Sequence, residues 1–119
     1  GQLFLKFAEY EIPVPASKAE SLRKGNYQNK KVILGIRPED VNDSEIFIEA
    51  SPQSVIESDV KVYELLGAEV YLYFEIEGTQ ITARVNPRTT SRAGDRVKIA
   101  LDMEKAHIFD KETEQIITN

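Results

Sequence analysis

The chain has 119 residues, of which 41% are hydrophobic and 29% charged, and its 15 basic and 20 acidic side chains give a net charge of −5. This length is typical of one domain with its own core, so we expect residues 1–119 to form a single domain. The acidic balance argues against nonspecific nucleic-acid binding, which depends on clustered lysine and arginine. The chain has no cysteine for a disulfide, and no apolar run approaches the roughly 18 residues of a membrane span.

The first residues predict a strand rather than a secretory signal peptide. Gly1 stands in place of an initiating methionine, and Leu3, Leu5 and Phe7 alternate with polar residues soon after it. We therefore expect this chain to be cut from a longer protein whose other part performs any catalysis.

One short helix is predicted after this strand. Ser17 and Glu20 have the spacing of a capping box, in which each side chain accepts a hydrogen bond from the other residue's backbone amide. Gly25 is placed to end the helix.

Strand patterns dominate the rest of the chain. Alternating apolar residues predict strands over residues 32–36, 45–50, 96–101, 107–109 and 115–118. Within residues 54–66 the alternation changes phase between Val62 and Tyr63, which predicts a bulge or bend of the kind that small barrels need at their corners.

The clearest prediction is a β-hairpin in which residues 69–77 pair with residues 80–85. Gly78-Thr79 between them has the sequence of a two-residue type II′ turn. Counting outward from that turn places Tyr73 opposite Arg84 on the polar face and gathers the apolar residues on the other face. Many short strands and one short helix together indicate an all-β barrel or sandwich.

The sequence carries no catalytic or metal-binding motif. Its glycines do not form a phosphate-binding loop, so we expect the chain to bind no nucleotide by itself. His107 is the only histidine, and neither it nor candidate partners such as Ser91 and Asp110 belong to a nucleophile motif. An imidazole hydrogen-bonded to a neighbour at the start of a strand is the simpler interpretation. The histidine and carboxylate spacings fit neither zinc nor calcium.

Two further features have a structural and a functional interpretation. The segment Arg37–Asp40 places opposite charges around a proline, and a solvated chain reversal is a simpler interpretation than ligand binding. Tyr71 and Tyr73 on the polar face are similar to the platform on which some barrels stack bases. Neighbouring glutamates would repel a phosphate backbone, so packing against another protein is the better interpretation.

Several blocks of the sequence resemble one family. The runs LGIRPEDV (34–41), VYELLGAEVYLYFEIEG (62–78) and residues 82–117, which contain A-R-V-x-P-R and H-I-F-D, resemble the C-terminal regulatory domain of the ATP-binding subunits of bacterial carbohydrate ABC importers. These importers are of the maltose, multiple-sugar and glycerol-phosphate type. The resemblance extends from about residue 22 to the end, whereas the first 20 residues depart from the pattern.

The resemblance implies an OB-like β-barrel, called a transport-associated domain, which follows a nucleotide-binding domain. It implies a noncatalytic role in regulation and in homodimerisation of the ATPase subunit, with ATP and Mg bound by the preceding domain. The subunit would bind permease subunits at the cytoplasmic face of the membrane and receive regulatory proteins. The expected structural or interface residues are Arg37, Glu39, Gly67, Glu69, Tyr71, Tyr73, Arg84 and Arg88.

A small-anion sensor is the alternative, because related domains of oxyanion importers bind molybdate-like anions. It would require convergence of the arginines Arg37, Arg84, Arg88 and Arg92. The negative net charge, and the lack of serine and lysine interleaved with these arginines, disfavour it. The hypothesis that the chain is a hydrolase is supported only by the presence of His107.

Overall fold

The computed structural model describes residues 2–118, so the two ends of the predicted 1–119 domain, Gly1 and Asn119, lie outside the described residues. Backbone contacts divide the chain into two compact units. The first combines Gly1–Ile36 with Met103–Asn119, and the second is Arg37–Asp102. The single-domain interpretation stays a prediction.

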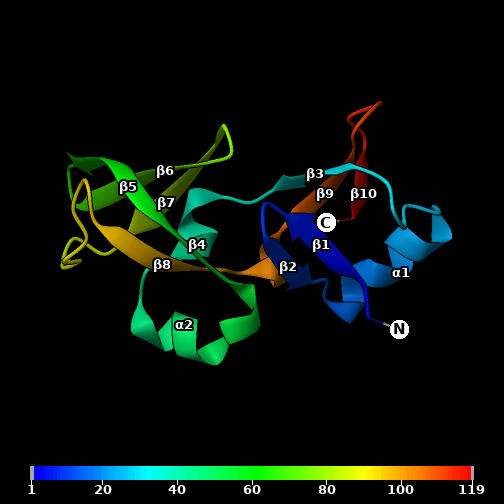
Figure 1. Cartoon of the computed structure of the whole chain (residues 1–119), viewed down its shortest axis with the longest axis horizontal. Helices are drawn as coiled ribbons and strands as arrows, with labels where there is room; N and C mark the ends of the chain where they lie inside the picture. The colour runs from blue at the N-terminus through cyan, green and yellow to red at the C-terminus, as the bar shows by residue number, and fades with distance from the viewer. Residues whose placement is uncertain (1, 119) are drawn as a thin grey trace. The chain divides into compact units, whose positions relative to one another are not determined.

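The first unit contains two small antiparallel sheets and a helix. Strands β1 (Phe4–Phe7) and β2 (Tyr10–Pro13) form a hairpin, which α1 (Ala16–Lys24) follows (Figure 1). The second sheet has the order β10-β9-β3, with bounds Ile116–Thr118, His107–Asp110 and Val32–Gly35, and a short 3-10 turn, η3 (Met103–Lys105), precedes β9. The core of this unit joins Val14, Ala19, Leu22 and Ile108. The strands predicted at 32–36, 107–109 and 115–118 are therefore confirmed to within two residues.

Helix α1 confirms the predicted helix but not its predicted cap. The helix begins at Ala16, and Pro15 rather than Ser17 occupies the N-cap position, with no side-chain cap hydrogen bond. Glu20 instead pairs with Lys24 at 3.1 Å, one turn further along the helix. The capping-box prediction is wrong because the Pro15 carbonyl already accepts from the first helical amides, which places Ser17 inside the helix. Gly25 is the C-cap, as predicted.

The second unit is a five-stranded antiparallel sheet that nearly closes on itself. Its order is β4-β8-β5-β6-β7, with bounds Val41–Asn42, Arg96–Leu101, Val55–Leu66, Glu69–Ile76 and Thr79–Val85 (Figure 1). The two edge strands, β4 and β7, also contact each other. The shorter elements are η1 (Pro38–Asp40), α2 (Glu45–Ala50) and η2 (Pro52–Ser54). Buried residues from all five strands fill the interior, among them Val41, Ile56, Leu72, Phe74, Ala83 and Ile99.

Strand β5 bends where the sequence predicts a bulge. Its first part, Val55–Asp59, pairs with β8, and its second part pairs with β6. The register shifts between Val60 and Val62, which confirms a bulge in this strand but places it before Val62, whereas the apolar pattern placed the phase change after Val62. The bulge lets one continuous strand serve both halves of the sheet and bends the sheet toward closure.

A second helix replaces the strand predicted over residues 45–50. The apolar alternation there is misleading: in α2, Ile46 and Phe47 are 77% and 50% exposed rather than packed on a sheet. Glu45 lies in the first turn, where a negative charge favours a helix, and Pro52 prevents its continuation. Residues 2–118 therefore contain two α-helices rather than the single one predicted.

The predicted β6–β7 hairpin is present with a different turn and register. The loop is Glu77-Gly78, and both residues have positive φ, 49° and 82°, as a type I′ turn requires. Tyr71, not Tyr73, therefore lies opposite Arg84. The shift is an even number of residues, so every side chain keeps its predicted face.

Candidate functional site

The solvent-facing side of β5, β6 and β7 gathers most of the residues singled out in the sequence. In β6, Val70, Leu72 and Phe74 are buried, so Tyr71 and Tyr73 point to the opposite side. Cross-strand pairing adds the neighbours of these tyrosines from β5 and β7. We call this surface the tyrosine face; it comprises Val62, Glu64, Leu66, Glu69, Tyr71, Tyr73, Glu75, Thr82 and Arg84.

Both tyrosine hydroxyls of this face donate to glutamates. The Tyr73 hydroxyl donates to Glu64 Oε1 at 2.8 Å, and the Tyr71 hydroxyl donates to Glu69 Oε2 at 3.2 Å. The bond to the carboxylate raises the pKa of Tyr73, because a phenolate would lose the bond and face a negative charge. Each ring is thus fixed at its polar end.

Arg84 joins this arrangement from β7. Its Nη1 lies 3.8 Å from Glu69 Oε1, and the negative charge of Glu69 is the main cause that raises the pKa of Arg84. Tyr71 contributes to the same shift, and so does Glu39, which η1 brings beside β7. The structure therefore brings together Glu39, Glu69, Tyr71 and Arg84, with Tyr73 next to them on β6.

The remaining predicted residues lie at other places in the second unit. Gly67 is in the exposed turn between β5 and β6, where its φ of 62° favours glycine. Arg37 is exposed directly before η1, and Arg88 is exposed in the loop that follows β7. That these residues form an interface stays a prediction.

Two of the four arginines proposed for an anion site, Arg84 and Arg92, have other partners. Arg84 is paired with Glu69, as described above. Arg92 lies over the ring of Tyr63 at 4.7 Å from its centroid, and its Nη1 donates to the carbonyls of Thr89 and Ser91 at 2.9 Å each. These contacts favour a structural role for Arg92.

A polar cluster that the sequence did not indicate fixes the loop after β7. The Asp43 carboxylate accepts from the hydroxyls of Thr89 and Ser91, the latter at 3.1 Å, and the Ser91 amide donates to Thr89 Oγ1 at 3.1 Å. Because Asp43 is 46 residues from Thr89 in the chain, no local pattern reveals the pairing. Ser91 is thus occupied in holding a loop.

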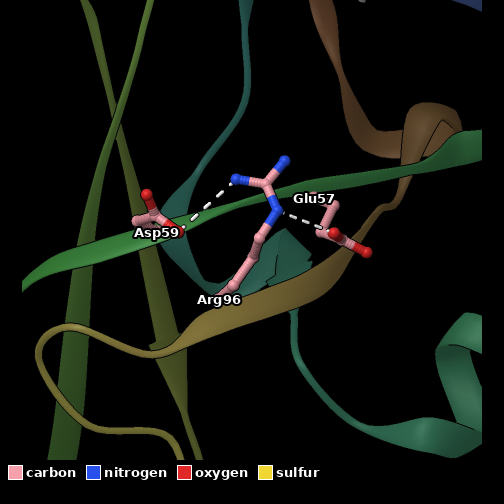
Figure 2. A network of polar contacts seen from close by, with 3 residues as sticks. All are labelled: Glu57, Asp59 and Arg96. Carbon is pink, nitrogen blue, oxygen red and sulfur yellow. Dashed lines mark hydrogen bonds and ion pairs between the residues drawn. The ribbon is translucent and has the colours of Figure 1, made fainter.

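A second unpredicted network links β8 to β5. Figure 2 shows the Arg96 guanidinium between the carboxylates of Glu57 and Asp59, with Nε 2.8 Å from Glu57 and Nη1 3.4 Å from Asp59. All three side chains are substantially exposed, so the network stabilises the β5–β8 pairing only modestly.

His107 begins β9, as predicted, and its ring is tilted against Phe109. Its Nδ1 atom is buried without a hydrogen-bond partner, so the expected bond to a neighbour is absent at this nitrogen. The Asp110 carboxylate accepts from the Tyr27 hydroxyl at 2.7 Å and from the backbone amides of Glu112 and Thr113. Asp110 therefore ties a turn together instead of orienting the imidazole.

Two kinds of feature are not found within residues 2–118. No group of three or more histidine, aspartate or glutamate side chains in this part of the chain is arranged to hold a metal ion. None of the helices described there has the length and apolar character to cross a membrane.

Comparison with known proteins agrees with this β architecture. The family model described as the TOBE domain matches residues 34–109, and the model described as the MalK OB fold domain matches residues 1–41. The expectation that the first 20 residues depart from the family pattern is therefore wrong. A nearly closed β-sheet with a tyrosine-bearing outer surface defines a small module of the OB type. The chain belongs to the TOBE domain family, and the prediction of an OB-like, transport-associated fold is confirmed.

The similar curated proteins are ATP-binding components of transporters. The oligosaccharides import ATP-binding protein MsmX of Bacillus subtilis is 40% identical over 110 residues, which cover 92% of this chain and 30% of MsmX. The multiple sugar-binding transport ATP-binding protein MsmK of Streptococcus mutans is 37% identical over 89% of this chain and 28% of MsmK. The ABC transporter ATP-binding protein YurJ of Bacillus subtilis is 27% identical over 98% of this chain and 32% of YurJ. The chain thus spans less than a third of the length of these relatives.

Proposed function

We propose that this chain is the regulatory and dimerisation domain of the ATPase subunit of a carbohydrate ABC importer. The observation that carries the proposal is the match of the TOBE domain over residues 34–109, together with 40% identity to an oligosaccharide-import ATP-binding protein. In this proposal the chain couples ATP hydrolysis elsewhere in the subunit to sugar uptake and performs no chemistry itself. ATP and Mg bind to a separate nucleotide-binding domain.

The proposal gives the subunit a location and a set of partners. Two copies of the subunit associate, and they bind the permease subunits at the cytoplasmic face of the membrane. The domain adds surfaces on which regulatory proteins act. The tyrosine face supports this part of the proposal, because partly exposed tyrosines whose hydroxyls are fixed are typical of protein interfaces.

Binding of nucleotide and dimerisation can both be measured on this chain alone. Calorimetric titration with Mg-ATP should detect no heat of binding, and sedimentation equilibrium should detect reversible dimerisation. Binding of Mg-ATP with micromolar affinity would contradict the noncatalytic role. If the chain were strictly monomeric, the proposed role in dimerisation would be contradicted, whereas the proposed regulatory role would remain.

A titration with molybdate separates the proposal from the anion-sensor alternative. A ligand that binds only the native state raises the melting temperature as its concentration increases. The proposal predicts no such increase, whereas a concentration-dependent increase would favour the sensor.

A further inference from the structure

The tyrosine face exposes apolar side chains of strand β5. Val62 is 48% exposed and Leu66 is 53% exposed, although both lie within β5. Val62 lies directly opposite Tyr73 across the β5–β6 pair, and Leu66 lies opposite Glu69. Aliphatic and aromatic surface therefore continues from one strand to the next, which is characteristic of a surface that a partner covers.

The hydrogen bonds of this face restrict its aromatic side chains before any partner arrives. Glu64 holds the hydroxyl of Tyr73 and Glu69 holds that of Tyr71. Restriction in the free state lowers the entropy lost when a partner packs on the two rings. The face is thus prepared for binding a folded or extended polypeptide rather than for catalysis.

The charge of the face determines which partner fits. Glu64, Glu69 and Glu75 are countered on the face by Arg84 alone, which pairs with Glu69. A second copy presenting this same face would bring like charges together, and a nucleic acid would bring phosphates to the glutamates. Arginine or lysine from a partner would instead meet carboxylates and lie over tyrosine rings.

We propose that the tyrosine face binds a basic amphipathic segment of a protein partner, one in which arginine or lysine alternates with apolar residues. The apolar side chains of the segment cover Val62 and Leu66, and its cations contact Glu64, Glu75 and the rings of the tyrosines. The inference rests on the proposed regulatory function for its biological setting, and it adds the chemistry of the partner and the surface used.

The test uses two short synthetic peptides and NMR titration of the labelled chain. One peptide alternates arginine with valine, and the other carries glutamate in place of arginine. We expect the basic peptide to shift the signals of Val62, Tyr71 and Tyr73, with an affinity that falls as salt is added, and the acidic peptide to leave them unchanged. Equal binding of both peptides, or shifts confined to other parts of the chain, would overturn the proposal.

A pair of matched variants tests the assignment to this face. Glu75→Lys and Glu112→Lys change the net charge equally at exposed positions, but only Glu75 lies on the tyrosine face. Glu75→Lys should lower the affinity of the chain for the basic peptide about fivefold at low salt. Glu112→Lys should leave this affinity within about 1.5-fold of that of the parent chain. Leu66→Ser should also lower the affinity for the basic peptide. Equal effects of the two charge reversals would overturn the proposal, since they would show only an effect of net charge.

Three controls exclude the other occupants and separate this inference from the proposed function. Concentration-dependent shifts of Val62 and Tyr73 without any peptide would assign the face to a second copy and overturn the proposal. Saturable binding of a single-stranded oligonucleotide to the same residues would overturn it as well. Because peptide binding requires neither ATP nor dimerisation, a chain that binds Mg-ATP but also binds the basic peptide here would contradict the proposed function and leave this inference standing.

Discussion

Tyr71 lies directly opposite Arg84 in the β6–β7 ladder, and both side chains interact with the same carboxylate, that of Glu69. The hydroxyl donates to one carboxylate oxygen, and the guanidinium lies 3.8 Å from the other. A register two residues away would have paired Arg84 with Tyr73 and left Glu69 with a different environment. The turn that sets this register therefore also sets the composition of the candidate surface.

Replacing Arg84 by alanine tests the role of this cluster. Arg84→Ala removes the cation beside Glu69 and makes the tyrosine face more negative. Because the pair is exposed, we expect a small decrease in melting temperature that diminishes at high salt. Binding of the basic peptide should become tighter. Weaker peptide binding, with the fold intact by circular dichroism, would show that Arg84 itself contacts the partner.

The two sides of the sheet should respond differently to loss of a leucine. Leu72 is fully buried, so Leu72→Ala should lower the free energy of unfolding by about 2–5 kcal/mol through lost transfer energy and an internal cavity. Leu66 is 53% exposed, and Leu66→Ala should change the free energy of unfolding by no more than about 0.5 kcal/mol. Urea denaturation of both variants measures the difference. Similar losses for both would contradict the assignment of inner and outer faces.

The β6–β7 turn offers a stabilising substitution. Glu77 has a φ of 49°, which costs most residues energy but is tolerated by asparagine, and Asn-Gly is the preferred type I′ pair. Glu77→Asn should therefore raise the free energy of unfolding by up to about 1 kcal/mol. Gly78→Ala, at a φ of 82°, should lower it by about 1 kcal/mol or more. If the turn were instead type II′ at Gly78-Thr79, Glu77→Asn would have no such effect in thermal denaturation.

Asp110 should make the stability of the first unit dependent on acid pH. The backbone amide of Thr113, followed by the Tyr27 hydroxyl, lowers the pKa of Asp110 below its ordinary value of 3.8. A lowered folded-state pKa means that the stabilisation is complete above 3.8 and is lost as the pH falls through the folded-state value. Asp110→Asn should lower the melting temperature at neutral pH and flatten its decline in acid. The exposed Glu112→Gln in the same turn serves as control for the loss of one negative charge.

Side-chain alternation was sufficient to predict which residues of the central hairpin face the interior. Val70, Leu72 and Phe74 are buried as expected, and the apolar pattern of β5 indicated a bulge, although the bulge lies before Val62 rather than after it. These features depend on the period of the strand, which the order of apolar and polar residues records directly.

Features that depend on competition between local signals were not predicted correctly. Gly78-Thr79 and Glu77-Gly78 both supply a glycine for a tight turn, and only the pairing of complete strands selects the second. Residues 45–50 alternate as a strand would, and their Ile-Phe-Ile run is common in strands, but none of the described strands pairs with them and they form a helix. The Asp43–Thr89 contact joins segments remote in sequence, so only the closed sheet creates it.

The sequence predicted most residues of the candidate site but not the hydrogen bonds between them. Tyr71, Tyr73, Glu69 and Arg84 were placed on one face by their parity along the strands. Glu64 was missed, although it holds the Tyr73 hydroxyl, because its position on that face follows only from the bulge earlier in β5.

The most direct test of the proposed function is a domain exchange in a related importer. The segment of Bacillus subtilis MsmX that aligns with this chain would be replaced by residues 1–119, with a deletion of that segment as control. Oligosaccharide uptake would be measured in cells that lack native MsmX, together with ATP hydrolysis by the purified proteins. Our account predicts that the exchange restores uptake, whereas the deletion retains ATP binding but not uptake. Undiminished uptake by the deletion protein would contradict the proposed coupling role.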